Sequence, residues 1–421
     1  MIAIGVLGLG NVGTGFMELL NSGKQTIENR LGTSVSVKKI LVRDTGRPRA
    51  RLAAGIITDR PDDILEDPSI SIVVELMGGL EPARTYIRRA LSRGKSVVTA
   101  NKEVVSCYGA ELMDLARENG VRFLFEGSVG GGIPIIRPIK ECLAANEIHS
   151  VTGILNGTTN FILTRMEEDS MELDDALAEA QRLGYAEADP ANDITGADVA
   201  RKIAILATMA FRRGIIPDVV STTGIDRVTL ADMRYAGELG YRVKLLGHVG
   251  RRDDGYEAWV APALVPLSHP LAGVRDSYNA VMVEGNACGT LMFYGRGAGG
   301  LPTASAVMGD VMEVIRGGPL PKFSFTSDSS LALLDSRTAV APFYIRLKAK
   351  DEPGVLAAVS GVFGRHGISL SMVLQKNAAG GIAEIVIVTH KTHLGAIHDA
   401  LIDLTSLSEV PAVDNYLRVW R

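Results

Sequence analysis

Apolar stretches alternate with amphipathic ones through the first third of the chain, and this alternation restricts the fold more than any other feature of the sequence. A short apolar strand opens residues 2–20. Strand-like and helical stretches then follow in turn at residues 36–44, 71–79, 84–94, 96–105 and 110–132. Strands that are apolar along their whole length and separated by helices indicate a parallel sheet covered on both faces. We therefore predict an α/β domain at the start of the chain.

The first strand leads directly into the sequence GLGNVG at residues 8–13. It fits the pattern G-x-G-x-x-G in an informative context, because it follows a strand and opens a helix. Gly8 allows a tight turn, Gly10 lets the backbone approach a pyrophosphate, and Gly13 permits close packing of helix on strand. The helix N-terminus adds free N–H groups. The sequence thus predicts a Rossmann-type dinucleotide-binding domain, with a fingerprint formed by Gly8, Gly10, Asn11, Val12 and Gly13.

The end of the second strand bears on the choice between NAD and NADP. An acidic residue there binds the ribose 2′-hydroxyl of NAD, whereas an arginine accepts the 2′-phosphate of NADP. Arg43 comes first, followed by Arg47 and Arg49, and a guanidinium suits bidentate recognition of phosphate. Asp44 could instead turn inward and favour NAD. We predict NADP with Arg43 at its 2′-phosphate, and NAD stays open as the alternative.

The rest of the chain divides into further domains, as expected for 421 residues. Residues 134–300 combine longer helices with strand-like stretches and predict an α+β substrate and dimerisation domain. Residues 295–318 form a glycine-rich turn and a helix, which we expect to pack back on the first domain. The dinucleotide-binding domain is therefore predicted to comprise residues 1–133 and about 301–320. Residues 321–342 predict a linker, and residues 343–421 follow the order βαββαβ of a ferredoxin-like unit.

Composition excludes several classes of protein. The net charge of −4 argues against nucleic-acid binding. No apolar run reaches the about 18 residues that cross a bilayer. Three scattered cysteines match no disulfide or metal pattern, and the chain begins with a strand and no signal peptide. We expect a cytoplasmic protein that binds neither nucleic acid nor membrane.

Candidate catalytic residues gather near residue 200. The apolar helix at 196–211 carries charges only at its start, where Asp198 and Lys202 share a face because they are four residues apart. The pair could be a surface ion pair, or it could face a pocket, where apolar surroundings lower the pKa of a lysine and make it a useful acid or base. Glu187, Asp189 and Asp193 precede the helix, either as ligands for a cationic group or as capping residues.

Several longer motifs make the chain resemble the homoserine dehydrogenase family, in family order from residue 8 to residue 307. Besides the fingerprint they are VVTANKE (97–103), FEGSVGGGIPII (125–136), GILNGTTNFIL (153–163), LGYAEADPANDITGADVARK (183–202) and GRGAGGLPTASAV (295–307). The tail resembles an ACT domain, an amino-acid-binding regulatory module, with DEPGVL (351–356) at its first strand–helix turn. Residues 134–300 would then be the catalytic domain and residues 343–421 the ACT regulatory domain.

The resemblance implies NAD(P)-dependent interconversion of L-aspartate 4-semialdehyde and L-homoserine, in threonine and methionine biosynthesis. It implies that Lys202 is the catalytic lysine and that Asp198 is the acidic residue beside it. The implied substrate-binding residues are Gly184, Glu187, Asp193, Asp198 and Lys102. Lys102 and Gly297 are also implied at the cofactor. A monovalent cation such as sodium is implied at Glu126 and the carbonyls of Val129, Gly131 and Ile133, a set of oxygen ligands that suits a hard cation.

The chemistry expected from these residues is simple. The cofactor supplies the hydride, and Lys202 gives the proton during aldehyde reduction and takes it back during alcohol oxidation. Lys102 follows a strand of the parallel sheet, whose carboxyl edge borders the ligand crevice. It could contact the nicotinamide side or the substrate carboxylate there.

ACT domains pair edge to edge, so the resemblance implies a homodimer or homotetramer with an amino-acid effector, and threonine is the natural hypothesis. Ser369 in GISL departs from the family pattern, which often has asparagine, and leaves the effector open. Two alternatives were weighed: an ACT-containing 2-hydroxyacid dehydrogenase, and a catalytically silent amino-acid sensor. The former places its fingerprint mid-chain and uses a histidine, and the latter would have lost residues such as Lys202.

Overall fold

The computed structural model describes residues 1–46, 55–318 and 332–420. These residues form two compact units. Of the described residues, unit 1 comprises 1–46, 55–151, 201–218 and 279–318, and unit 2 comprises 152–200, 219–278 and 332–420. Among the described residues, no helix has both the length and the apolar character that a bilayer crossing requires.

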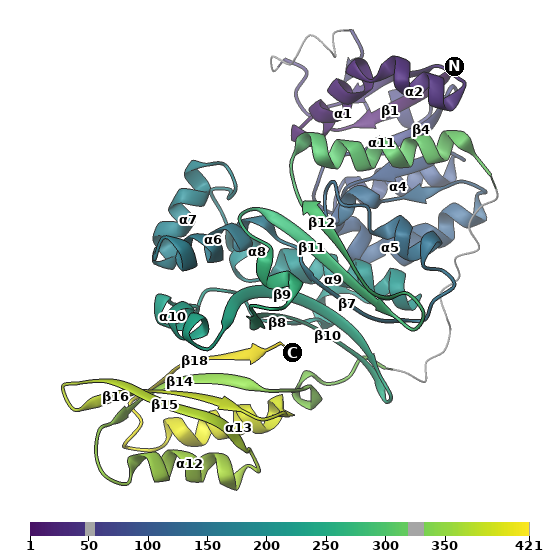
Figure 1. The fold of residues 1–421 in the computed structure, drawn as a ribbon. Helices are drawn as coiled ribbons and strands as arrows, with labels where there is room; N and C mark the ends of the chain where they lie inside the picture. The colour runs from purple at the N-terminus through teal and green to yellow at the C-terminus, as the bar shows by residue number, and fades with distance from the viewer. Residues whose placement is uncertain (47–54, 319–331, 421) are drawn as a thin grey trace. The chain divides into compact units, whose positions relative to one another are not determined.

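Unit 1 is built on a six-stranded sheet in the order β3-β2-β1-β4-β5-β6, in which every neighbouring pair is parallel (Figure 1). The strands are β1 (Ile2–Leu7), β2 (Val35–Leu41), β3 (Ile57–Thr58), β4 (Ile70–Glu75), β5 (Ser96–Thr99) and β6 (Phe123–Leu124). This order confirms the predicted Rossmann-type sheet. The direction of winding reverses between β1 and β4, and ligands of such sheets bind in the crevice at that point.

The helices of unit 1 cover this sheet. They are α1 (Asn11–Ser22), α2 (Lys24–Leu31), α3 (Asp62–Leu65), α4 (Ala83–Ser92), α5 (Lys102–Glu118) and α11 (Gly300–Arg316). Helix α11 lies against α1, although almost 280 residues separate them: a Cβ on Gly15 would come within 2.8 Å of the carbonyl oxygen of Gly300 (Figure 1). Val307 and Val311 of α11 belong to the same buried cluster as Ile4 and Phe16. Helix α11 therefore packs on the same apolar core as β1 and α1.

The strand predicted at residues 96–105 ends earlier, at Thr99. The reason is the side chain of Asn101, which accepts hydrogen bonds from the backbone N–H groups of Glu103 and Val104, both at 3.2 Å. An asparagine that accepts these bonds caps a helix N-terminus. Lys102 is therefore the first residue of helix α5.

Unit 1 also contains residues 126–142 and 279–296, which lie outside the six-stranded sheet. Its further elements are the 3₁₀ turn η2 (Glu126–Ser128), the π-helical turn η3 (Pro138–Cys142), and strands β11 (Tyr278–Gly285) and β12 (Gly289–Arg296). Strand β7 (Ile148–Ile154) and helix α9 (Ala197–Phe211) each run from one unit into the other.

Unit 2 combines helices with a long antiparallel hairpin. Strands β9 (Tyr241–Arg252) and β10 (Gly255–Pro266) pair along their whole length. The short strand β8 (Ser221–Thr222) pairs with β10. The helices of this part are α6 (Gly157–Glu168), α7 (Leu173–Arg182), α8 (Ala191–Ile194) and α10 (Leu230–Glu238). This mixture of helices and strands agrees with the predicted α+β character.

The C-terminal part of unit 2 has the predicted βαββαβ order. Its elements are β14 (Phe343–Lys350), α12 (Val355–Arg365), β15 (Leu370–Ala379), β16 (Ile382–Thr389), α13 (Leu394–Thr405) and β18 (Ala412–Val419). The strands are arranged β18-β14-β16-β15. Both helices share one apolar core with the sheet, which includes Phe343, Val359, Phe363 and Ile397.

This small sheet is hydrogen-bonded to strand β10. Ala263 of β10 pairs in parallel with Arg418 of β18, and the N–H of Trp420 donates to the carbonyl of Leu264 at 2.8 Å. The described part of the predicted linker also pairs with its surroundings: Leu333 bridges Tyr256, and β13 (Val340–Ala341) pairs with β17 (Thr392–His393). Strand pairing therefore joins residues 332–342 to the domains they connect.

A buried carboxylate links helix α10 to the C-terminal sheet. Asp232 is 0% exposed and forms a capping box with Thr229 at the start of α10. It accepts hydrogen bonds from Arg346 Nε at 2.8 Å, Tyr344 Oη at 3.1 Å and Asn415 Nδ2 at 2.9 Å. A buried charge is tolerated when several donors surround it, so this carboxylate holds together strands β14 and β18 and helix α10.

We predict that Asp232→Ala lowers the free energy of unfolding of unit 2 by about 3–5 kcal/mol, because the change leaves buried donors unpaired. Urea unfolding followed by circular dichroism measures this loss. Asp226→Ala, at an exposed aspartate in the preceding loop, is the matched control and should unfold like the wild type. Equal unfolding midpoints for the two variants would contradict this role of Asp232.

Candidate active site

The glycine-rich turn after β1 has the shape of a phosphate cradle. Gly8 has φ +99°, and a Cβ at this position would meet the carbonyl oxygen of Leu76 at 2.7 Å. A Cβ on Gly13 would lie 2.5 Å from the carbonyl oxygen of Gly8. At Gly10, which caps α1 without a side-chain hydrogen bond, a Cβ would meet nothing within 4 Å. Two glycines thus serve the packing, and the third leaves open space at the N-terminus of α1, which fits a pyrophosphate.

The loop before α11 lies against this turn. A Cβ on Gly300 would be 2.6 Å from Oδ1 of Asn11, which places α11 beside the fingerprint. Gly297 lies still closer to Asn279, whose amide group would be 1.9 Å from an added Cβ. Asn279 is 0% exposed, and neither atom of its amide has a hydrogen-bond partner among the described residues. Nothing in the sequence patterns singled out this buried amide.

Two acidic residues determine the local structure at the carboxyl ends of the strands. Glu75 ends β4, is fully buried and accepts hydrogen bonds from Thr99 Oγ1 at 2.6 Å and from Met77 N at 2.7 Å. Burial raises the pKa of this carboxyl group. Asp44 accepts a hydrogen bond from the N–H of Gly46 at 2.8 Å, whereas Arg43 beside it is exposed. Arg47 and Arg49 lie outside the described residues.

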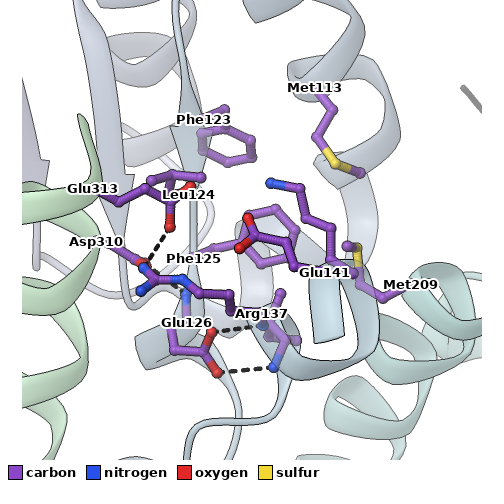
Figure 2. Close-up of a pocket in the computed structure, with 12 residues that line it drawn as sticks. Met113, Phe123, Leu124, Phe125, Glu126, Arg137, Glu141, Met209, Asp310 and Glu313 are labelled. Atoms are coloured by element: carbon purple, nitrogen blue, oxygen red, sulfur yellow. Dashed lines mark hydrogen bonds and ion pairs between the residues drawn. The ribbon is translucent and has the colours of Figure 1, made fainter. Parts of the chain in front are cut away.

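The carboxylate of Glu126 is held by backbone N–H groups (Figure 2). Oε1 accepts from Ile135 at 2.6 Å. Oε1 also accepts from Ile136, and Oε2 accepts from Arg137, both at 2.8 Å; Figure 2 draws these two bonds. The N–H of Glu126 donates in turn to Oδ2 of Asp310 at 2.8 Å. The side chain of Glu126 therefore organises the segment 126–137 from within.

Asp310 and Glu313 of helix α11 line a pocket together with Glu126 and Arg137 (Figure 2). Burial, together with the nearby charge of Glu126, raises the pKa of Asp310 to about 8. The guanidinium of Arg137 lies 3.2 Å from Asp310 and 2.5 Å from Glu313. The three side chains join helix α11 to the segment after η2.

In unit 2, one asparagine joins two of the predicted site carboxylates. Nδ2 of Asn156 donates to Oδ1 of Asp193 at 2.6 Å and to Oδ2 of Asp198 at 2.8 Å. Its Oδ1 accepts from the N–H of Thr159 at 2.8 Å and so caps helix α6. Asp198 is buried, and Asp193 is half-buried. The motif GILNGTTNFIL contained Asn156, but the sequence alone assigned it no role.

The other predicted substrate residues lie on the loop between α7 and α8. Gly184 has φ +78°, a backbone conformation that favours glycine. Glu187 is exposed, and its carbonyl oxygen accepts a hydrogen bond from Gln181 Nε2 at 3.1 Å. The backbone of this loop is thus held in place, while the carboxylate of Glu187 faces outward.

Lys202 follows Asp198 by one turn of helix α9, so the two side chains project from the same face. Lys202 is 8% exposed and Asp198 is 3% exposed. The pair is thus buried, which speaks against the alternative of a solvated surface ion pair. Lys102, at the first position of α5, follows strand β5 at the carboxyl edge of the parallel sheet.

A Rossmann-type sheet with a glycine cradle, in a chain that ends in a ferredoxin-like unit, is typical of a nicotinamide-dependent dehydrogenase with an added regulatory domain. Family models support this class over almost the whole chain. Residues 8–126 match the homoserine dehydrogenase NAD-binding domain, residues 134–312 match homoserine dehydrogenase itself, and residues 343–405 match the ACT domain.

Full-length relatives agree with these models. The chain is 42% identical to a homoserine dehydrogenase of Synechocystis, with 99% of each chain covered, and 39% identical to that of Bacillus subtilis, with 99% and 98% covered. The crystal structure of a homoserine dehydrogenase from Thiobacillus denitrificans superposes with a TM-score of 0.94 at 41% identity, covering 100% of this chain and 98% of that one. The chain belongs to the homoserine dehydrogenase family and is an oxidoreductase.

A hyperthermophilic archaeal homoserine dehydrogenase, solved in complex with NADPH, is more distant. It has a TM-score of 0.66 and 30% identity, and it covers 76% of this chain and 99% of its own. The family supports the dehydrogenase prediction over both alternatives weighed from the sequence, the 2-hydroxyacid dehydrogenase and the silent sensor.

Gly13 and Gly10 have different surroundings in the cradle, so we predict different outcomes when each is replaced by alanine. Gly13→Ala forces a Cβ against the carbonyl of Gly8, so we expect a lower melting temperature and no NADPH binding. The Cβ of Gly10→Ala meets no protein atom, so this variant should melt like the wild type. It should nevertheless bind NADPH at least about tenfold more weakly, because the methyl group occupies the space for the pyrophosphate. Thermal melts and NADPH fluorescence titrations check both, and a destabilised Gly10→Ala would contradict the assignment.

Proposed function

We propose that this chain interconverts L-aspartate 4-semialdehyde and L-homoserine with NADP(H), and that Lys202 exchanges the proton. The observation that carries the proposal is the buried pair of Asp198 and Lys202, one turn apart on helix α9, in a chain that matches homoserine dehydrogenases from end to end. The nicotinamide, when bound, supplies or accepts the hydride.

The proton step is assigned to the side chain of Lys202. As the aldehyde oxygen gains negative charge during reduction, the ammonium group donates a proton to it, and in the reverse direction the neutral amine takes the proton from the alcohol. Asp198 lies on the same face and provides a negative charge that orients the ammonium group. Asn156 supports this role, because its amide holds one oxygen of Asp198 at 2.8 Å.

The carboxylates of unit 2 fit the α-ammonium group of the substrate. We assign Glu187, Asp193 and Asp198 to this group, with the backbone of Gly184 completing the contact. Lys102 is assigned to the substrate carboxylate or to the nicotinamide side. Its place at the carboxyl edge of the parallel sheet supports this role.

NADP is the proposed cofactor, held by Gly8, Gly10, Asn11, Val12 and Gly13, with Lys102 and Gly297 beside it and Arg43 at the 2′-phosphate. The exposed guanidinium of Arg43 supports NADP. The turn that Asp44 forms with Gly46 supports it too, because this carboxylate already has a partner. NAD stays the alternative.

A monovalent cation such as sodium is proposed at the segment 126–133. The carbonyl oxygens of Val129, Gly131 and Ile133 accept no hydrogen bond from any described residue, which supports them as ligands. The carboxylate of Glu126 is occupied by three N–H groups. The backbone carbonyl of Glu126 accepts one long hydrogen bond, from the N–H of Val129 at 3.5 Å, so we assign this carbonyl, and not the side chain, to the cation.

Regulation and assembly are proposed from the ACT domain. An amino acid, with threonine as the first candidate, would bind near the turn at residues 351–356, and the chain would work as a homodimer or homotetramer. The cysteines of the described residues are free, which fits a reducing compartment such as the cytoplasm.

Lys202→Ala tests the proposed proton transfer. We expect kcat for aspartate semialdehyde reduction to fall by at least about 100-fold, the range typical of general acid–base groups, while NADPH binds as in the wild type. Lys348→Ala, at an exposed lysine, is the control and should keep full activity. The assay follows NADPH absorbance, and near-normal turnover of Lys202→Ala would remove this residue from the mechanism.

Arg43→Ala tests the proposed cofactor. Loss of a guanidinium from a phosphate should raise KM for NADPH by about tenfold or more and leave KM for NADH nearly unchanged. Arg30→Ala, at an exposed arginine of helix α2, should alter neither constant. Equal changes for the two cofactors would argue against Arg43 as the residue that reads the 2′-phosphate.

A further inference from the structure

A small cavity within unit 2 lies where strands β8 and β10 meet the ACT domain. Its polar and apolar lining includes Ser221, Thr223, Trp259, Leu394, Tyr416 and Arg418. None of these residues belongs to the predicted effector turn at 351–356 or to the residues assigned to catalysis. The space open to a water-sized sphere is about 30 Å³, enough for about two water molecules or one small anion.

Arg418 carries a buried positive charge into this cavity. It is 8% exposed, and its guanidinium lies 4.7 Å from the ring centre of Trp259 and 5.7 Å from that of Phe343. No described residue forms a hydrogen bond or an ion pair with the guanidinium. Burial lowers the pKa of Arg418, as expected for a charge without close compensation.

The nearest acidic group is already engaged elsewhere. Glu257 attracts Arg418, but its carboxylate lies 3.3 Å from Nε2 of His248 and 3.7 Å from Nη1 of Arg252. The cavity lining itself contains no carboxylate. A planar guanidinium that is buried, unpaired and open to a cavity is the arrangement expected of an anion site, since arginine binds carboxylates and phosphates through parallel N–H donors.

We propose that this cavity binds a small oxyanion, with a carboxylate as the form that best matches the guanidinium of Arg418. The hydroxyl groups of Ser221 and Thr223 line the same space and donate to the anion. Leu394 and the ring of Trp259 form an apolar wall that suits a short aliphatic chain. Because β10 and β8 supply one side of the cavity and β18 and α13 the other, the anion joins the catalytic part of unit 2 to its ACT domain.

The chain offers a direct optical readout of this site. It contains only two tryptophans. Trp259 lines the cavity, and the ring of Trp420 is centred 5.9 Å from that of Trp259. Tryptophan fluorescence of the full-length protein therefore reports on the surroundings of Arg418 without an added label.

The experiment titrates the full-length protein with sodium acetate and with sodium phosphate, each against sodium chloride at equal ionic strength. We expect a saturable change in tryptophan fluorescence that chloride does not produce. Saturation with acetate identifies a carboxylate site. Saturation with phosphate alone identifies inorganic phosphate as the source of the oxyanion. The absence of any saturable change beyond that of chloride overturns the proposal.

Arg418→Met removes the charge and keeps an apolar side chain on Trp259, so it should weaken binding at least about tenfold. Arg365→Met, at an exposed arginine of the ACT domain, is the matched control and should bind like the wild type. The double variant Ser221→Ala, Thr223→Val keeps Arg418 and should weaken binding a few-fold, which keeps the test decisive if Arg418→Met fails to fold. If the double variant and a folded Arg418→Met both bind the anion with unchanged affinity, the proposed anion site is contradicted.

Discussion

Unit 2 depends on the carboxylate of Asp232, because this single group satisfies donors from both of its parts. Asp232 lies in the first turn of α10, and its partners Tyr344, Arg346 and Asn415 lie on strands of the ACT sheet. Arg346 also contacts Glu384 at 3.1 Å and Asp414 at 2.7 Å. A buried charge of this kind costs much free energy unless all its partners are present. The ACT domain is therefore attached by specific polar contacts as well as by the pairing of β10 with β18.

The same physical rule shapes the other functional regions. Glu126 is buried because three backbone N–H groups surround its carboxylate, and Glu75 is buried because Thr99 and Met77 donate to it. Asn156 does the same for Asp193 and Asp198. In each case a polar group that would be costly to bury alone is used to give a loop one conformation. Arg418 is the contrasting case, a buried charge that Glu257 attracts but that has no hydrogen-bond or ion-pair partner among the described residues.

Attachment of the ACT domain through β18 has a consequence for regulation. Arg418 and Trp420 follow one another closely at the end of the chain, and both contact residues of the catalytic part of unit 2. A ligand that changes the position of β18 would act on β10 directly, through the hydrogen bonds of a shared sheet edge. Coupling between sites requires an element of this kind, whose position both sites influence.

Much of the architecture could be predicted from local patterns. Apolar runs and glycines predicted the parallel sheet with its phosphate cradle, and the βαββαβ order predicted the ACT domain, because strand and helix periodicity are properties of neighbouring residues. Asn101 shows the limit of this approach, since one capping side chain ended β5 earlier than the apolar pattern suggested. The boundary of the linker was equally hard to predict, because Val340 and Ala341 pair with a strand that is distant in sequence.

The sequence by itself determined the fold class, the family and the residue types available for catalysis, because these follow from short motifs and their order. Only the tertiary structure decided which polar groups meet: Asn156 with Asp193 and Asp198, Asp232 with Arg346, and Arg418 with a cavity instead of a carboxylate. Residues far apart in the chain become neighbours when elements pack, and the need to satisfy buried donors and acceptors selects among the possible contacts. No local pattern carries that information.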